Sequence, residues 1–231
     1  ANFATSGIHA NNTPNVTLVN NLVINNMTPG SAYNSIAYRR SAGTANTVPT
    51  TYQVASDNNL FYAGTPGTAN LIYGEGAATL TNAKQTLADY KTFMTTRDQA
   101  SRTEATTPFV NVATDSMLHI AATTATFVEG GGKAYNGLTT DIDGQTRNAS
   151  TPDIGADEGN FTSTLPQILS FAASPATGQC SAVNHTVTVT TGSSVTGVTL
   201  NYAYDGVAQT GIAMTSSGTN TWTVAIPAAT A

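Results

Sequence analysis

Residues 141–158 read DIDGQTRNASTPDIGADE and hold five of the thirteen acidic side chains of the 231-residue chain. Two carboxamides and Arg147 complete the polar content of this acidic stretch. Short apolar runs separated by asparagines precede it, whereas longer alternating runs follow it. The stretch therefore marks a change of architecture, and we place the two domains at residues 1–164 and 165–231.

The first domain begins with two short apolar runs, at residues 16–19 and 22–24, which asparagines separate. In a parallel β-helix, each coil contributes short strands that stack on those of the next coil. Asparagine at the corners tolerates the left-handed backbone conformation and can form side-chain ladders. The pattern therefore predicts the rungs of a parallel β-helix. Similar runs recur at residues 35–38, 51–54, 59–62 and 70–73.

One segment of the first domain has helical periodicity instead. Its apolar side chains predict a helix over residues 87–94 that packs across the β-helix. Thr86 is the expected N-cap, and Asp89 is an acidic partner in the first turn. The predicted apolar face consists of Leu87, Tyr90, Phe93 and Met94. Strands are expected again at residues 108–110, 117–120 and 125–128, and Gly130–Gly132 is expected to be a flexible connector.

The second domain has the alternation of antiparallel strands, separated by turns rich in Gly and Ser. Asp205-Gly206 is a strong hairpin signal. An immunoglobulin-like sandwich needs about seven strands, so a sandwich that lacks its last two strands is predicted. The five expected strands lie at residues 168–171, 185–191, 198–204, 207–214 and 222–226.

The composition excludes several classes of partner and site. Only 9% of the residues are charged and the net charge is −5, so there is no basic surface for nucleic acid or an anionic membrane. No apolar run reaches the 18 or so residues that a membrane span needs.

Cys180 is the only cysteine, which excludes an internal disulfide and a Cys-rich zinc site. We expect it to be buried or paired beyond residue 231. Because the chain begins at Ala1 without Met, we interpret it as a processed product or an excerpt.

The acidic stretch is the candidate site. Asp141 and Asp143 would share one face of a strand, as calcium ligands or as a glycosidase-like carboxylate pair. The alternative is structural: Asp143-Gly144 forms a tight turn, and Arg147 pairs with an acidic side chain and fastens the last coil. The expected partners of Arg147 are Asp141, Asp153 or Asp157. A closing cap made of ion-paired residues would cover the exposed end of a β-helix. The expected cap residues are Arg147, Asp153, Asp157 and Glu158.

No catalytic residue is assigned within the chain. His9, His119 and His185 belong to three different segments, so no metal triad is expected, and His119 is interpreted as a strand histidine that a neighbour satisfies. Arg39-Arg40 is the only basic pair, and adjacent strand residues point to opposite faces. A lyase site would need more than this pair, so any catalytic residues are expected upstream of Ala1.

Several segments resemble the C-terminal coils of bacterial right-handed parallel β-helix proteins. They are DNNLFY at 57–62, the helix with Arg97-Asp98-Gln99, the strand at 118–120, and DIDGQTR followed by PDIGADE. The last two are similar to the closing motif of the choice-of-anchor Q group. Residues from about 166 resemble the immunoglobulin-like modules that follow such β-helices in large secreted proteins of Bacteroidetes, many of which the type IX route exports.

The resemblance implies an extracellular or cell-surface location. Members of the group resemble polysaccharide lyases, adhesins or stalk proteins. We therefore expect a non-catalytic structural or adhesive segment, with glycans or secretion and anchoring proteins as partners and no cofactor other than calcium. The alternative is the C-terminal part of a carbohydrate-active β-helix enzyme whose active site lies upstream. A third hypothesis is cargo or a bound partner of a secretion assembly.

Overall fold

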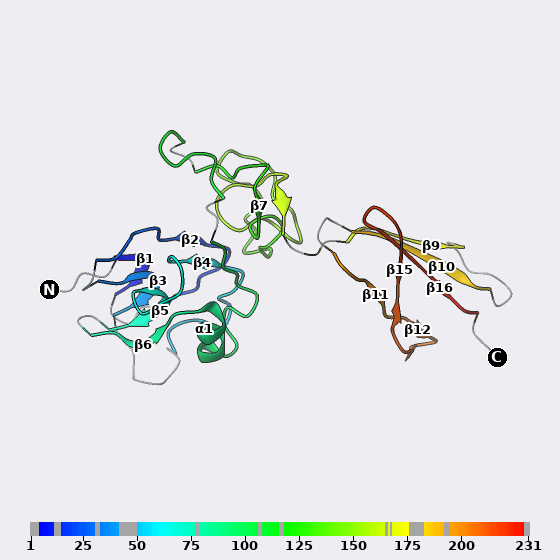
Figure 1. The fold of residues 1–231 in the computed structure, drawn as a ribbon, viewed down its shortest axis with the longest axis horizontal. Coiled ribbons are helices and arrows are strands. Elements are labelled where there is room, and N and C mark those ends of the chain that lie inside the picture. The colour runs from blue at the N-terminus through cyan, green and yellow to red at the C-terminus, as the bar shows by residue number, and fades with distance from the viewer. Residues whose placement is uncertain are drawn as a thin grey trace. The chain divides into compact units, whose positions relative to one another are not determined.

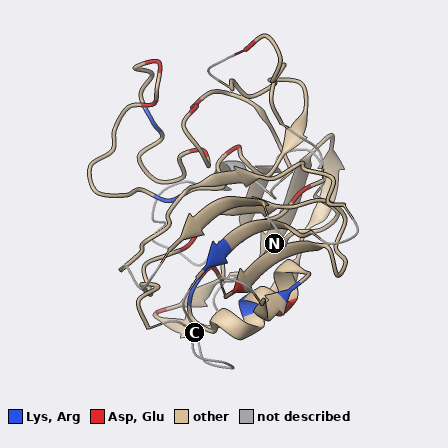
Figure 2. Cartoon of the chain, turned by 90° about the vertical axis from the view of Figure 1, so that its left-hand side faces the viewer, with Lys and Arg blue, Asp and Glu red and all other residues tan. Residues whose placement is uncertain are grey.

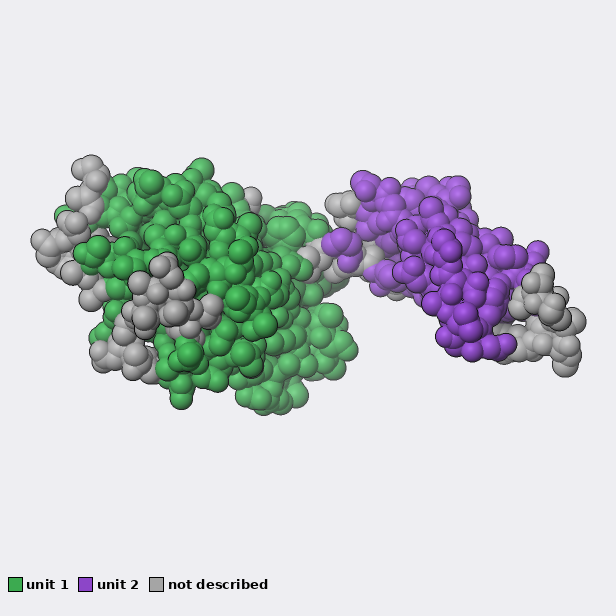
Figure 3. All heavy atoms as spheres, turned by 90° about the horizontal axis from the view of Figure 1, so that it is seen from below, with its two compact units in different colours: residues 1–165 green, residues 166–231 purple. Residues whose placement is uncertain are grey.

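The computed structural model describes residues 5–11, 15–30, 33–41, 50–76, 79–105, 108–115, 118–164, 166, 168–175, 183–191 and 195–228. The fold is mostly β with one short helix (Figure 1). The chain divides into two compact units, Ala1–Leu165 and Pro166–Ala231 (Figure 3). Cys180 and Met117 lie outside the described residues, so the predictions for Cys180 stay untested.

The first unit contains a four-stranded sheet in the order β1-β3-β5-β6. Its first three strands are parallel and in register, so that Thr5 pairs with Ser35 and Ser35 with Asn70. The last strand is antiparallel. The strands are β1 (Thr5–Ala10), β3 (Ser35–Arg40), β5 (Asn70–Glu75) and β6 (Thr81–Lys84). The predicted runs at 35–38 and 70–73 are confirmed, whereas β1 was not predicted because Ile8 is its only large apolar residue.

A second parallel pairing joins β2 (Leu22–Ile24) to β4 (Leu60–Tyr62), and Leu60 makes a further parallel bridge to Arg102. Two more parallel bridges join the segments that precede β2 and β4 in the chain: Val16 to Tyr52, and Val19 to Asp57. The predicted strands at 22–24 and 59–62 are confirmed. The run at 51–54 is wrong as a strand, because only Tyr52 pairs.

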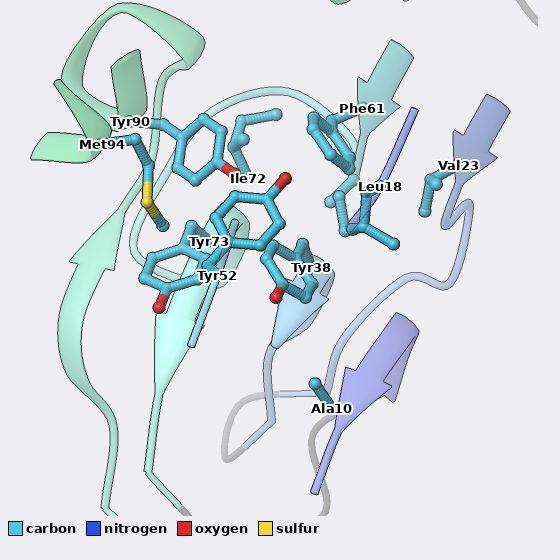
Figure 4. Packing of buried hydrophobic residues seen from close by; sticks show 12 residues of the cluster. Ala10, Leu18, Val23, Tyr38, Tyr52, Phe61, Ile72, Tyr73, Tyr90 and Met94 are labelled. Atoms are coloured by element: carbon cyan, nitrogen blue, oxygen red, sulfur yellow. The ribbon is translucent and has the colours of Figure 1, made fainter. Parts of the chain in front are cut away.

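The interior of this unit is rich in tyrosine (Figure 4). Tyr38 lies 5.2 Å from Tyr52 and 5.5 Å from Tyr73 between ring centroids, which adds aromatic contact to apolar burial. A buried hydroxyl needs a hydrogen-bond partner. Tyr52 and Tyr90 each donate to Asp98 Oδ2 over 2.6 Å, so the core holds a carboxylate that is fully buried and well satisfied.

The only helix of the described residues is α1 (Leu87–Met94), as predicted. Thr86 is its N-cap, since its side-chain oxygen accepts a hydrogen bond from Asp89 N over 3.1 Å. The Asp89 carboxylate accepts from the Thr86 hydroxyl over 2.7 Å in return, so the two side chains fix the first turn together. Tyr90 and Met94 are buried in the core of the first unit, so the expected apolar face is confirmed.

The described residues between 104 and 164 are mostly irregular, with β7 (Ala125–Thr126) parallel to β8 (Thr162–Ser163). Their apolar side chains Ile120, Val128 and Ile154 form a second core with Leu60. The predicted strand at 117–120 is wrong for its described residues: only Ile120 makes a bridge, and Leu118 has a φ of +57°. Asp115 accepts a hydrogen bond from His119 N over 2.7 Å. The Asp115 side chain thus takes the place of the backbone carbonyl that a neighbouring strand would supply.

The flexible connector expected at Gly130–Gly132 is also wrong. Gly131 and Gly132 are buried, and a Cβ at Gly131 would lie 2.2 Å from Phe127 O and 2.9 Å from Ile154. A Cβ at Gly132 would lie 2.6 Å from Pro152 O. These glycines permit the close approach of two backbone segments.

The second unit has a four-stranded antiparallel sheet in the order β15-β16-β10-β9, and two short pairs, β11-β14 and β12-β13. Val187 and Val189 are buried opposite Val224 and Trp222. The strands are β9 (Ile168–Ser174), β10 (His185–Thr191), β11 (Thr199–Leu200), β12 (Ala203–Tyr204), β13 (Val207–Ala208), β14 (Ile212–Ala213), β15 (Thr215–Gly218) and β16 (Thr221–Ile226).

The predicted strands at 168–171, 185–191 and 222–226 are confirmed. Those at 198–204 and 207–214 are each divided into two short strands. Outside these strands, backbone hydrogen bonds from Gln209 N to Tyr202 O and from Met214 N to Val198 O also join the two segments. Asp205 and Gly206 have φ values of +46° and +82° and connect β12 to β13, so the hairpin is confirmed.

Candidate functional site

Asp141 organises the turn that the sequence predicts at this point. Gly144 N donates to Asp141 O over 3.4 Å, and Gly144 has a φ of +83°. The Asp141 carboxylate accepts from Asp143 N (2.9 Å) and Gln145 N (2.7 Å) with one oxygen and from Glu158 N (3.0 Å) with the other. Burial alone would raise the pKa of Asp141, but these backbone donors lower it below its usual value.

His119 lies between two carboxylates. Its Nε2 is 2.9 Å from Asp143 Oδ2, and its Nδ1 is 3.0 Å from Asp115 Oδ2. The hydrogen bond to Asp143, followed by that to Asp115, raises the pKa of His119 against the opposing effect of desolvation. His9 contacts Ser41 and His185 contacts Pro175 O, so neither joins this group.

Asp157 joins the two aspartates that the sequence proposes as calcium ligands. One oxygen from each of Asp141, Asp143 and Asp157 lies within 4.8 Å of the others, and this is the only such group of three or more among the described residues. Calcium takes six to eight oxygen ligands, so the cluster fits it in part and would need backbone or water oxygens as well. Asp157 Oδ2 already accepts from Ile120 N over 2.7 Å.

Arg147 forms its ion pair with Glu158, Nη1 to Oε2 at 3.2 Å, and both side chains are buried. The prediction of Asp141, Asp153 or Asp157 as its partner carboxylate is therefore wrong. The carboxylates of these aspartates accept hydrogen bonds from backbone N–H groups instead. Arg147 also donates to the carbonyls of Asp153 (3.1 Å) and Gly155 (2.6 Å). It thereby holds the loop at residues 153–155, which forms no β-ladder.

Glu158 and Asp153 act mainly as acceptors for backbone N–H groups. Glu158 accepts from Asn148 N and Asp153 N, and Asp153 accepts from Gly130 N (2.7 Å) and Gly159 N (3.0 Å). Burial raises the pKa of Asp153 to about 7, although both backbone donors favour its ionised form. These acids satisfy buried backbone in an irregular segment, as buried N–H groups require.

A cavity of about 560 Å³ adjoins the acidic cluster. Its walls come from residues 19–22, from the loop that carries Phe109 and Leu118, and from residues between Tyr135 and Asp157. Sequence reasoning missed this cavity because its walls lie far apart in the chain. The available signal was the polar sequence around two apolar residues, Leu138 and Ile142. In the structure these side chains are 61% and 50% exposed.

Arg39 and Arg40 build no site together. Arg39 donates to Gly76 O, whereas Arg40 is fully buried and donates to the hydroxyls of Tyr38 and Thr51. Their opposite orientation is as predicted. Figure 2 shows the charged residues as short, separate segments of a mostly uncharged chain.

Among the described residues, no helix is long and apolar enough to cross a membrane. In comparisons with protein-family models, curated proteins and solved structures, nothing matched the chain.

Proposed function

We propose that the chain is a non-catalytic structural or adhesive segment of a large secreted or cell-surface protein. In this proposal, residues 1–164 are the end of a right-handed parallel β-helix, and residues 165–231 are an incomplete immunoglobulin-like module. Glycans or secretion and anchoring proteins are the proposed partners.

One observation carries the β-helix proposal: asparagine corners repeat in successive passes of the chain. Asn20 and Asn58 both have a φ of +56°, and each follows a residue of the parallel bridge between Val19 and Asp57. The next residues, Asn21 and Asn59, form a ladder in which Asn59 Oδ1 accepts from Asn21 N (2.9 Å) and Asn21 Nδ2 (3.0 Å). Stacked coils explain this repetition, because equivalent corners then lie above one another.

The strand order of the second unit supports the immunoglobulin-like proposal. One sheet of that fold has the order A-B-E-D. If β9 and β10 are A and B, and β15 and β16 are D and E, the observed order β15-β16-β10-β9 is the same order read backwards. The segment between β10 and β15 would then begin the second sheet.

The contacts of the acidic stretch support a structural role. Asp141, Asp153 and Glu158 each accept two or more backbone N–H groups, and Arg147 is bound to two carbonyls and one carboxylate. A general acid or base would have to reach a substrate proton. These carboxylates instead hold the loops of their own chain.

The test is an assay of the purified chain against acidic and neutral polysaccharides, with release of reducing ends and of unsaturated products as readouts. We expect no cleavage, and we expect binding of intact glycans or of surface proteins where the adhesive role applies. Cleavage that disappears in Asp141→Ala would overturn the non-catalytic proposal in favour of a carbohydrate-active enzyme.

Calcium binding is a second proposal, based on the approach of Asp141, Asp143 and Asp157 within 4.8 Å. A ligand that binds only the folded state raises stability by about 2.7 kcal/mol at one hundred times its Kd. Calcium, but not magnesium, should then raise the melting temperature of the wild type and not that of Asp157→Asn. An equal response of both proteins would overturn it.

A further inference from the structure

Three exposed apolar side chains line one cavity. Leu118, Leu138 and Ile142 line the cavity and are 44%, 61% and 50% exposed. Val110 and Val112, exposed to 60% and 64%, follow the lining residue Phe109 in the same loop. Exposed apolar groups that form a contiguous group around a hollow mark an interaction site more often than scattered ones do.

The cavity has the size and the lining of a binding pocket. Its volume of about 560 Å³ lies within the range of roughly 300–1,000 Å³ that is typical of such sites, and it is large enough for an aromatic side chain. Leu22, Phe109 and Tyr135 supply apolar and aromatic walls, and Asn21 and Asp157 supply polar groups.

The polar edge of the cavity is negatively charged. Asp157 lines the wall, and Asp141 and Asp143 flank the lining residue Ile142, with oxygens of all three within 4.8 Å. The cation in the wall, Arg147, is already paired with Glu158. His119 adds one imidazole between Asp143 and Asp115, so carboxylates outnumber cations at this edge. The edge therefore complements a positively charged group and repels an anion.

We propose that this cavity is a docking site for a peptide segment of a partner protein, in which an aromatic side chain enters the cavity and neighbouring Lys or Arg side chains contact the carboxylates of Asp141, Asp143 and Asp157. The inference rests on the proposed adhesive role and specifies its partner chemistry. Aromatic residues dominate binding energies at protein interfaces, and the negative edge selects their basic neighbours.

The test measures binding of a dye-labelled Gly-Ser peptide with a central Lys-Trp-Lys, by fluorescence anisotropy in the presence of EDTA. Replacing the Trp by Ala should weaken binding about tenfold or more, because the burial of an aromatic ring is lost. Replacing both Lys by Glu should weaken it at least about fivefold, and added salt should weaken binding of the Lys peptide.

Two protein variants probe the two parts of the site. Ala156→Trp fills the cavity from its wall and should weaken binding about tenfold, although it adds apolar surface. Asp143→Asn removes one charge of the edge and should weaken binding about two- to fivefold. The matched controls lie in the second unit: Val207→Trp, at a residue that is 65% exposed, and Asp205→Asn should leave binding unchanged. The melting temperature of each variant verifies that it folds.

The proposal is overturned if the Ala or Glu peptide binds as tightly as the Lys-Trp-Lys peptide, or if Ala156→Trp binds equally or better. It is also overturned if tryptamine alone binds as tightly, which would indicate a small-molecule site, or if binding requires calcium. Polysaccharide cleavage by the chain would overturn the proposed function and leave these peptide results unaffected.

Discussion

Arg147 and Glu158 form an ion pair that is almost fully removed from water, with 4% and 9% of their side chains exposed. Taking one partner away leaves an uncompensated buried charge, which costs more than the pair contributes. Arg147→Ala should therefore lower the free energy of unfolding by about 3 kcal/mol, measured by urea denaturation. In Arg147→Met/Glu158→Gln, the loss should be smaller than the sum of the two single losses. An unchanged denaturation midpoint in Arg147→Ala would show that the guanidinium contributes nothing.

The asparagine ladder predicts a large effect of one carboxamide. Asn59 is fully buried and donates to Leu18 O (2.9 Å) and Asp98 Oδ1 (2.8 Å) while it accepts from Asn21. Asn59→Ala leaves several buried groups without partners and should cost roughly 3 kcal/mol. Asn34→Ala is the control, because the bond from Asn34 to Thr68 O is exposed, and it should cost less than about 0.5 kcal/mol. Equal midpoints in the two variants would contradict a structural ladder.

Gly131 should tolerate no side chain. A Cβ there would lie 2.2 Å from a backbone oxygen, so the two segments must separate, and Gly131→Ala should cost about 1–3 kcal/mol in thermal or urea unfolding. At Gly67, the nearest atom would be 3.9 Å away. Gly67→Ala should therefore be neutral or slightly stabilising. The opposite order of the two variants would show that residues 127–132 and 154 do not pack as described.

Asp153 predicts a pH dependence of stability. Its pKa rises to about 7 in the folded state, from an ordinary value of 3.8. Between these values the unfolded chain has lost the proton and the folded chain retains it, so this contribution to stability decreases as pH rises from about 4 to about 7. The upper bound is about 4 kcal/mol, from about three units at 1.36 kcal/mol each.

Urea denaturation across this pH range compares the wild type with Asp153→Asn. The wild type should lose more stability with rising pH than the variant does, and the difference should level off above about pH 7. Parallel curves for the two proteins would mean that Asp153 is ionised throughout the range. The control is Asp89→Asn, because Asp89 lies in the exposed helix cap.

Segments whose interactions lie within a few residues were predicted well. The helix at 87–94 was placed correctly, because Thr86 and Asp89 cap it locally. The Asp205-Gly206 hairpin depends on two adjacent residues that adopt positive φ. Errors occurred where a side-chain hydrogen bond or tertiary packing overrides the local pattern. In the strand predicted at 117–120, the Asp115 carboxylate accepts a hydrogen bond from His119 N, and the glycines at 131 and 132 pack against residues 127, 152 and 154.

The candidate site divides in the same way. The turn at Asp143-Gly144 follows from the sequence. Asp141 and Asp143 were expected to share one face of a strand, and that prediction is wrong: they lie in a turn in which Asp143 N donates to the Asp141 carboxylate over 2.9 Å. Arg147 was recognised as a residue that fastens the acidic stretch, but its partner is Glu158, eleven residues away. Local sequence does not rank the competing acids, since the backbone N–H groups of distant loops occupy Asp153 and Asp157.

The sequence by itself determined the β-rich class, the helix, the hairpin turns and the concentration of acids at 141–158, because backbone propensity and short-range hydrogen bonds act within a few residues. Only the tertiary structure decided which acid pairs with Arg147, that Asp157 joins Asp141 and Asp143, and that a cavity opens beside them. The physical reason is distance along the chain: Leu22, Phe109 and Tyr135 become neighbours only after the parallel strands and the irregular segment have packed together. The local sequence of the acidic stretch thus determines its turn, whereas the tertiary structure determines which residues and which cavity adjoin that turn.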